Sequence, residues 1–301
     1  MLILTNCLTD TVDEGALKVA NSLVKRIKAS SDEVKVLSYD REHILSDKHL
    51  KLNKLMLNKQ LISEIRKSRS DLLYIPFPAK TLPTAIRIFI LSLYKRGNMN
   101  TVLVMKGKYS FFAKLFLRLS RSNIIALSKE SAEYYKQILS EKRVKYIKAG
   151  VDTKRFVPAA KQEQSELKLK YGLDKDRPVV LHVGHLKYGR NVQKLADIDK
   201  QYQVLLVCST LTENERDEDL KQRLSSCDNI RIIDSYIPCI EEIYKFSDIY
   251  FFPTYASSNC IDVPLSVLEA ASCDKPVVAT KFGELKEFVN KEGFYFINYI
   301  H

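Results

Sequence analysis

The stretch that decides the fold is residues 179–192, Val179-Val-Leu-His-Val-Gly-His-Leu-Lys-Tyr-Gly-Arg-Asn-Val192. Its apolar, β-branched start predicts a buried strand that ends at Gly184, and a basic loop leads from there into a predicted helix over 190–198. A glycine at the end of a strand lets the backbone approach a ligand closely. Loop amides, a helix N-terminus and Arg190 together predict a diphosphate site. The alternative is an ordinary strand-to-helix turn with charged side chains on its surface.

The same alternation of apolar runs and amphipathic segments extends along the whole chain. The predicted strands are Leu2–Thr5, Val34–Tyr39, Leu72–Phe77, Thr101–Met105, Ile124–Leu127, Val144–Ile147, Val179–Val183, Val204–Cys208, Ile230–Ile233, Ile249–Phe252, Val277–Thr280 and Phe294–Ile297. Helical spacing is found over 16–27, more loosely over 50–65, after Ser128, and over 190–198, 213–225, 241–246, 267–273 and 284–290. Repeated β–α alternation predicts parallel sheets with right-handed crossovers.

The alternation is interrupted once, by a polar segment over 152–177. A chain of 301 residues also exceeds the usual size of one domain. We therefore predict an α/β fold with two Rossmann-like domains that face a cleft, residues 1–156 and 157–301. In such sheets, ligands bind beyond the carboxyl ends of the strands.

Charge is unevenly distributed along the chain. The formal net charge is +12, but residues 1–157 hold 30 Lys and Arg against 14 Asp and Glu, whereas the remainder holds 18 against 22. Residues 72–129 contain ten basic side chains and no acidic one. Within 109–121 these alternate with apolar side chains, which predicts a helix with an apolar side and a cationic side.

Such a helix suits an anionic lipid surface or another polyanion. We predict that Lys108, Lys114, Arg118 and Arg121 face a membrane. The alternative is a half-buried helix whose Lys and Arg side chains extend to water. No known nucleic-acid-binding motif accompanies the charge, and we expect no nucleic-acid partner.

Composition and targeting signals indicate a globular protein of the cytoplasm. Apolar tracts are too short to span a bilayer, and the start lacks the basic and apolar regions of a signal peptide. The six cysteines are scattered without a CxxC pair, and no His, Cys and Asp set has the spacing of metal ligands. We expect a cytoplasmic protein, peripheral on the inner face of the membrane.

A second candidate site follows the predicted strand Ile249–Phe252, within residues 253–280. Asp262 lies in a polar loop, Pro264 precedes a helix, and amides near Leu265–Val267 would point at an anion beyond the helix start. Glu269, one to two turns into that helix, could accept hydroxyl groups of a ribose. The alternative is that Asp262 caps the helix and Glu269 forms a salt bridge.

These motifs resemble the retaining glycosyltransferases of family four, which have the GT-B fold. That family carries a glycine-arginine-leucine stretch, then lysine-glycine, and later two glutamates separated by seven residues. The matching positions here are Gly184-His-Leu186, Arg190-Asn191, Leu268-Glu-Ala270, Lys275–Thr280, Gly283, Glu287 and, between the halves, Ile147–Pro158. The resemblance extends over about residues 123–290 and is only architectural before that.

The resemblance implies transfer of a sugar, a hexose by expectation, from a nucleoside diphosphate donor to a glycan or lipid-linked acceptor, with retention and without an obligatory metal. Residues 1–156 would then be the acceptor-side domain and residues 157–301 the nucleotide-sugar-binding domain. The implied donor-binding residues are Gly184, His185, Arg190, Leu265, Ser266 and Glu269. Arg190 would stabilise the departing diphosphate.

Three positions depart from the family pattern. Counting back from Glu269, Ile261 stands at the position of the first glutamate, and Asp262, one residue later, is the carboxylate we expect to act on the donor sugar. His185 replaces a permanently charged arginine. The family's paired glycines of the first domain are reduced to Gly15, near the donor phosphate or the acceptor. These departures leave a second interpretation open, in which the protein binds sugar nucleotides as a non-catalytic partner subunit.

Overall fold

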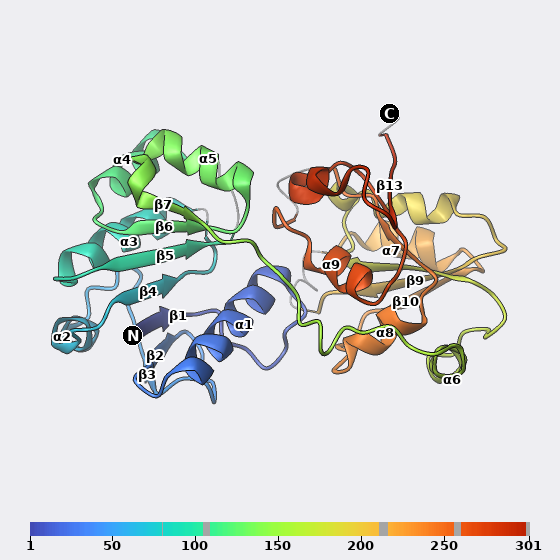
Figure 1. Ribbon diagram of the computed structural model, residues 1–301, viewed down its shortest axis with the longest axis horizontal. Coiled ribbons are helices and arrows are strands. Elements are labelled where there is room, and N and C mark those ends of the chain that lie inside the picture. The colour runs from blue at the N-terminus through green and yellow to red at the C-terminus, as the bar shows by residue number, and fades with distance from the viewer. Residues whose placement is uncertain (80, 105–108, 211–215, 256–259, 299–301) are drawn as a thin grey trace. The chain divides into compact units, whose positions relative to one another are not determined.

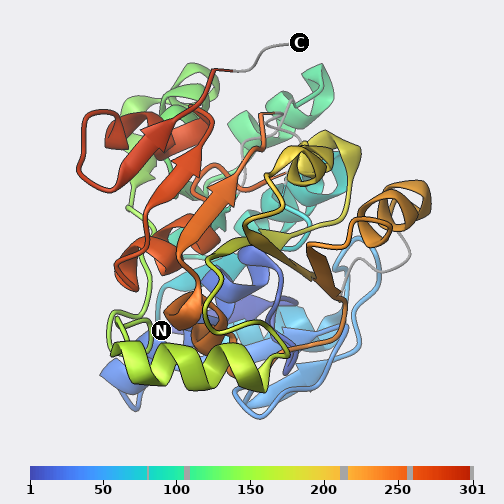
Figure 2. The same ribbon diagram turned by 90° about the vertical axis from the view of Figure 1, so that its right-hand side faces the viewer.

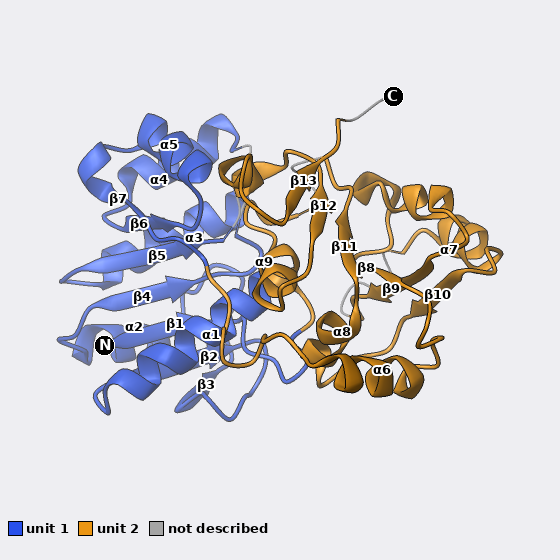
Figure 3. Ribbon diagram, turned by 45° about the vertical axis from the view of Figure 1, so that its right-hand side comes forward, with its two compact units in different colours: residues 1–12, 16–149 blue, residues 13–15, 150–301 orange. Residues whose placement is uncertain are grey.

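The computed structural model describes residues 1–79, 81–104, 109–210, 216–255 and 260–298. Contacts divide the chain into two compact units, residues 1–12 with 16–149 (unit 1) and residues 13–15 with 150–301 (unit 2; Figure 3). The longer segment of unit 2 thus starts at Gly150, whereas the sequence-based division falls after residue 156. Each unit is built on one parallel β-sheet with helices on its faces (Figure 1).

Unit 1 contains a seven-stranded sheet in the order β3-β2-β1-β4-β5-β6-β7. Its elements are β1 (Leu2–Thr5), α1 (Gly15–Ser30), β2 (Lys35–Tyr39), β3 (Lys48–Leu50), α2 (Lys59–Lys67), β4 (Leu72–Ile75), α3 (Leu82–Tyr94), β5 (Met99–Leu103), α4 (Phe111–Leu119), β6 (Asn123–Ala126), α5 (Lys129–Ile138), a 3-10 turn (Glu141–Arg143) and β7 (Val144–Tyr146). All four residues of β1 are buried because helices cover both faces of the sheet.

Local signals account for most of these elements. The helix predicted over 16–27 is α1, and Ser128 caps α5 by accepting a hydrogen bond from the Ser131 amide at 3.0 Å. Both predictions are confirmed. The single helical pattern expected over 50–65 is wrong, because β3 ends at Leu50 and α2 begins only at Lys59.

Unit 2 contains a six-stranded sheet in the order β10-β9-β8-β11-β12-β13. Its elements are α6 (Lys161–Lys170), β8 (Val179–Gly184), 3-10 turns (Tyr188–Arg190 and Val192–Asp197), β9 (Gln203–Cys208), α7 (Glu218–Ser225), β10 (Ile230–Ile233), α8 (Ile240–Phe246), β11 (Ile249–Phe252), α9 (Leu265–Ser272), β12 (Val277–Ala279), a 3-10 turn (Gly283–Phe288) and β13 (Phe294–Phe296). The six strands predicted in this half are confirmed.

The helix predicted over 190–198 is wrong. Asn191 has a left-handed backbone (φ 58°) and separates two short 3-10 turns, so no α-helix starts at Arg190. The helix predicted over 284–290 is likewise a 3-10 turn, Gly283–Phe288. Any anion site after β8 therefore depends on side chains and loop amides, and has no helix dipole behind it.

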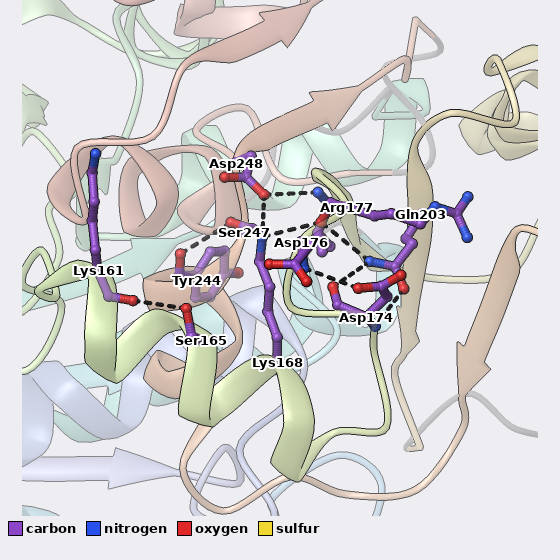
Figure 4. Close-up of polar contacts among 11 residues, drawn as sticks. Lys161, Ser165, Lys168, Asp174, Asp176, Arg177, Gln203, Tyr244, Ser247 and Asp248 are labelled. Atoms are coloured by element: carbon purple, nitrogen blue, oxygen red, sulfur yellow. Dashed lines mark hydrogen bonds and ion pairs between the residues drawn. The ribbon is translucent and has the colours of Figure 1, made fainter.

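The polar segment over 152–177 contains a helix that the sequence analysis did not predict. Helix α6 packs on α8 and runs along one side of unit 2 (Figure 2). Lys168, buried on α6, donates to Asp248 at 2.9 Å and to the Arg177 carbonyl at 3.1 Å (Figure 4). Asp248 in turn accepts from the first amide of β8, that of Val179, at 2.8 Å. This polar cluster lies at the amino end of β8, away from the end where Gly184 lies.

In both sheets the second and third strands are added on one side of the first strand, and the later strands are added on its other side. The strand order therefore reverses next to β1 in unit 1 and next to β8 in unit 2. This is the topology of the Rossmann fold, and the prediction of two Rossmann-like domains is confirmed. Ligands bind such sheets beyond the carboxyl ends of the strands that flank the reversal. In unit 2 those strands are β8 and β11. Within the described ranges, none of the helices combines the length and apolar composition that crossing a bilayer requires.

Candidate functional site

The candidate site of unit 2 is built on the loops that follow β8 and β11. These loops are hydrogen-bonded to each other, because Asn191 Nδ2 donates to the Pro253 carbonyl and Thr254 Oγ1 donates to the Arg190 carbonyl, both at 3.3 Å. Thr280, after β12, donates through its hydroxyl to the Thr254 carbonyl. The loop that presents Arg190 is thereby fixed against the centre of the sheet.

Arg190 is the cation of this site. Its side chain is buried, with 7% exposure, and its Nε has no hydrogen-bond partner among the residues that the structure describes. Within the part of the chain that the structure describes, no carboxylate forms an ion pair with this guanidinium. Burying an unpaired charge is costly, and an anion that binds beside it recovers part of that cost. The arrangement therefore favours an anionic ligand.

Gly184 and His182 lie beside Arg190 at the end of β8. A Cβ atom on Gly184 would be 3.1 Å from His182 Nε2 and 3.5 Å from Arg190 Nη1, so glycine leaves this space open. His182 is fully buried, its Nδ1 lies 2.8 Å from the Phe251 carbonyl, and its Nε2 has no hydrogen-bond partner within the described ranges. Since a carbonyl only accepts, Nδ1 carries the proton. Burial lowers the pKa of His182 to about 4, so the ring is neutral at pH 7.

The loop before α9 is held by a glycine. Gly283 has φ 47°, and a Cβ there would lie only 2.3 Å from the Asp262 carbonyl oxygen, which accepts from the Glu284 amide at 3.0 Å. Asp262 is buried. The N-cap residue of α9 is Pro264, whose own side chain makes no capping hydrogen bond. Leu265 and Ser266 open the helix, and their amides belong to the first turn, where helical partners are lacking.

Glu269 lies on α9 with 3% exposure. Its Oε2 accepts a hydrogen bond from the hydroxyl of Tyr244, on α8, at 2.8 Å. Tyr244 is fully buried against Phe156 and Tyr250, and burial together with the Glu269 charge raises its pKa well above the usual value. The hydroxyl thus stays protonated and orients the carboxylate.

Residues 13–15 group with unit 2 and contact the ends of its strands. Asp13 accepts from the Thr210 amide at 2.5 Å, from the Thr210 hydroxyl at 2.7 Å and from the Ser209 hydroxyl at 3.3 Å. A Cβ on Gly15 would lie 3.0 Å from Cδ1 of the buried Ile261. An apolar side chain therefore occupies the space next to Gly15 from the position where the resembling family has a glutamate.

The structure brings several predicted residues to the carboxyl ends of β8 and β11 and leaves others elsewhere. Gly184 ends β8, and His185 and Arg190 follow it. After β11, Asp262 precedes α9, and Leu265, Ser266 and Glu269 lie on that helix. On unit 1, Lys114 and Arg118 lie on α4 and Arg121 follows it, while Lys108 lies outside the described residues. Arg121 is exposed, and Arg118 Nε donates to the Ile138 carbonyl at 3.0 Å.

Three further contributors had no usable sequence signal. None of His182, Tyr244 and Asp13 is among the site residues predicted from the sequence. Each acts through a partner distant in the chain, which local patterns do not reveal. Among the residues that the structure describes, no group of three or more His, Cys, Asp or Glu side chains could hold a metal ion.

Residues 177–299 match the family described as Glycosyl transferases group 1. Among solved structures, Anabaena HepE with UDP is 18% identical, with a TM-score of 0.75 over 99% of this chain and 85% of that one. HepE with UDP-glucose is 18% identical, with a TM-score of 0.73 over 96% of this chain and 83% of that one. A Rickettsia africae glycosyltransferase is 16% identical, with a TM-score of 0.70 over 100% of this chain and 84% of that one. At these identities the likeness shows the fold. No curated protein sequence matches the chain.

Proposed function

We propose that the protein is a glycosyltransferase that moves a sugar, a hexose by expectation, from a nucleoside diphosphate to an acceptor, with retention of the anomeric configuration. The observation that carries the proposal is the buried Arg190 guanidinium beside Gly184, at the carboxyl edge of the sheet in unit 2, which forms no ion pair with a carboxylate among the described residues. The match of residues 177–299 to the glycosyltransferase family supports it, because Arg190 and Glu269 both lie inside the matched segment.

The chemistry requires a stabilised leaving group. When the bond from the anomeric carbon to the diphosphate oxygen breaks, the electron pair stays on the diphosphate, which gains negative charge. Arg190 is a fixed cation that needs no reorganisation at that moment. His185 and the backbone of Gly184 are proposed beside it, and the amides of Leu265 and Ser266 are proposed to bind sugar or phosphate.

Two carboxylates have different proposed roles. Glu269, oriented by Tyr244, accepts hydrogen bonds from the ribose of the donor. The resembling family has its first glutamate at the position of Ile261. Asp262 is the carboxylate next to that position, and we therefore propose that it acts on the donor sugar. Gly15 is proposed near the donor phosphate or the acceptor. No metal is assigned to the reaction, since cationic and amide groups fill the role of a divalent ion.

Retention is proposed from the family resemblance, and the acceptor is proposed to be a glycan or a lipid-linked molecule. The basic first half supports an acceptor that carries negative charge or lies at an anionic surface. We place the protein in the cytoplasm, peripheral on the inner face of the membrane.

The proposal is tested by titrating the protein with UDP and GDP in a calorimeter, and then with the corresponding nucleotide sugars in a hydrolysis assay. UDP is the first probe because the HepE structures contain it. We expect Arg190→Ala to weaken binding by about tenfold to a hundredfold, the loss expected for a charge-assisted contact of about 1.5–3 kcal/mol. Lys187→Ala, three residues earlier in the same loop, is the matched control. Unchanged affinity in Arg190→Ala would remove the site assignment.

Ile261 favours a second candidate, a non-catalytic subunit that binds sugar nucleotides. The residue is buried and apolar where the family pattern has a glutamate, and its Cδ1 lies next to Gly15. The two candidates predict the same nucleotide affinity but differ in turnover. Donor hydrolysis or transfer to an acceptor supports the enzyme, whereas tight binding without hydrolysis across a panel of nucleotide sugars supports the subunit.

A further inference from the structure

The short helix α4 of unit 1 has two apolar faces, and only one is covered. Ala113 and Leu117 are buried against the sheet. Phe111 and Phe112 are 74% and 61% exposed, and Leu115 and Leu119 on the same outer side are exposed as well. Two neighbouring phenylalanines and two leucines in water are unusual, because a single such side chain gains about 1.5–3 kcal/mol when it is buried.

Helix α3 is the helical neighbour of α4 in unit 1. It packs beside α4, with the rings of Phe89 and Phe116 5.7 Å apart between the two helices. Leu93, in the last turn of α3, is exposed, and Arg87 is the one charged residue of that helix. We call the set Phe111, Phe112, Leu115 and Leu119 the outer apolar face.

Positive charge borders this face. Around the helix, Lys114 and Arg118 lie on the side of Phe111 that is turned away from Phe112, and the exposed Arg121 follows the end of α4. No acidic residue occurs between Leu72 and Lys129, the segment that builds α3 and α4. A partner of this surface therefore has to offer an apolar interior and a negatively charged boundary.

We propose that unit 1 docks on an anionic membrane by inserting the outer apolar face of α4 at the boundary between lipid headgroups and acyl chains, with Lys114 and Arg121 on the headgroups. Helix α4 has nine residues, so it lies in the membrane plane and does not cross the bilayer. A nucleic acid would satisfy the charges and leave the leucines in water. A second copy of this chain would bring the same positive charges together. The inference concerns unit 1 alone and stands whether or not unit 2 transfers a sugar.

A fluorescence measurement tests insertion directly. The chain contains no tryptophan, so Phe111→Trp in the 301-residue chain places a single indole in the outer apolar face. With vesicles of phosphatidylcholine and phosphatidylglycerol, we expect a blue shift of its emission and quenching by lipids brominated on the acyl chains. With phosphatidylcholine alone we expect a much smaller shift. An indole that stays in water on phosphatidylglycerol vesicles overturns the proposal.

Flotation with the same vesicles separates the apolar and charged contributions. We expect Phe111→Ser with Leu115→Ser to lower the partition coefficient at least about tenfold. Ile44→Ser, which removes an exposed apolar side chain elsewhere in unit 1, is the matched control and should change nothing. Circular dichroism verifies that each variant is folded.

The charge variant is Lys114→Gln with Arg121→Gln, because Arg118 is anchored to a carbonyl. We expect a loss of about fivefold per side chain, and none for the exposed pair Lys25→Gln and Arg26→Gln on α1. Three outcomes would contradict the proposal. The first is flotation that is unchanged in the serine variant. The second is binding to oligonucleotides without binding to vesicles. The third is a dimer that dissociates in the serine variant while flotation is unchanged.

Discussion

Replacing Tyr244 by Phe removes one hydroxyl group from the candidate site and leaves the ring in place. That hydroxyl donates to Oε2 of Glu269 at 2.8 Å, and both side chains are almost completely buried. A hydrogen bond to a charged group contributes about 1.5–3 kcal/mol. We expect the free energy of unfolding in urea to fall by about that amount.

The same substitution tests whether Tyr244 is a positioning residue for the ribose contact of the proposed function. We expect the wild-type protein to bind UDP about tenfold or more tightly than 2′-deoxy-UDP, since one hydroxyl bonded to a carboxylate is lost. In Tyr244→Phe the carboxylate loses its orientation, and this ratio should shrink to about two or three. Calorimetry with both nucleotides measures it.

Tyr171→Phe provides the control. The Tyr171 hydroxyl donates to Glu242 at 2.7 Å in the same unit, so this variant also loses a tyrosine–glutamate hydrogen bond. It should leave the ratio between the two nucleotides unchanged. If Tyr244→Phe keeps the wild-type ratio, the positioning role is refuted. A wild-type ratio near one instead removes the ribose contact of Glu269, which is a separate failure.

Other predictions concern stability. The hydrogen bonds from Lys35 and Lys48 lower the pKa of Glu64 to about 2. Because the folded pKa lies below the unfolded one, the stabilisation is present above about pH 4.5 and disappears as the pH falls toward 2. After allowance for solvent screening, Glu64→Gln should cost about 1–2 kcal/mol at pH 7 and nothing near pH 2, in urea unfolding at both values. Gly283→Ala should cost more than about 1 kcal/mol in thermal unfolding, because its Cβ would collide with the Asp262 carbonyl. Gly150→Ala, with open space at its Cβ, should be neutral, and equal melting temperatures would contradict this account.

Much of the fold, and part of the candidate site, was predictable because the signals are local. The strand that ends at Gly184, the capping of α5 by Ser128 and the acid-free run over 72–129 are each visible within a few neighbouring residues. The order of strands and helices also follows from local apolar spacing, since each element buries one face. By contrast, the side chains over 190–198 favour a helix, but the left-handed backbone of Asn191 prevents it.

The sequence by itself determined the two-sheet α/β fold and the positions of Arg190 and Glu269 after particular strands, because both depend on periodicity along the chain. Only the tertiary structure decided that Arg190 is buried without a carboxylate among the described residues and that Tyr244 holds Glu269. It also decided which apolar face of α4 meets the sheet. A helix with apolar side chains all around it has no preferred inward side until its neighbours pack, and here that packing left Phe111 in water.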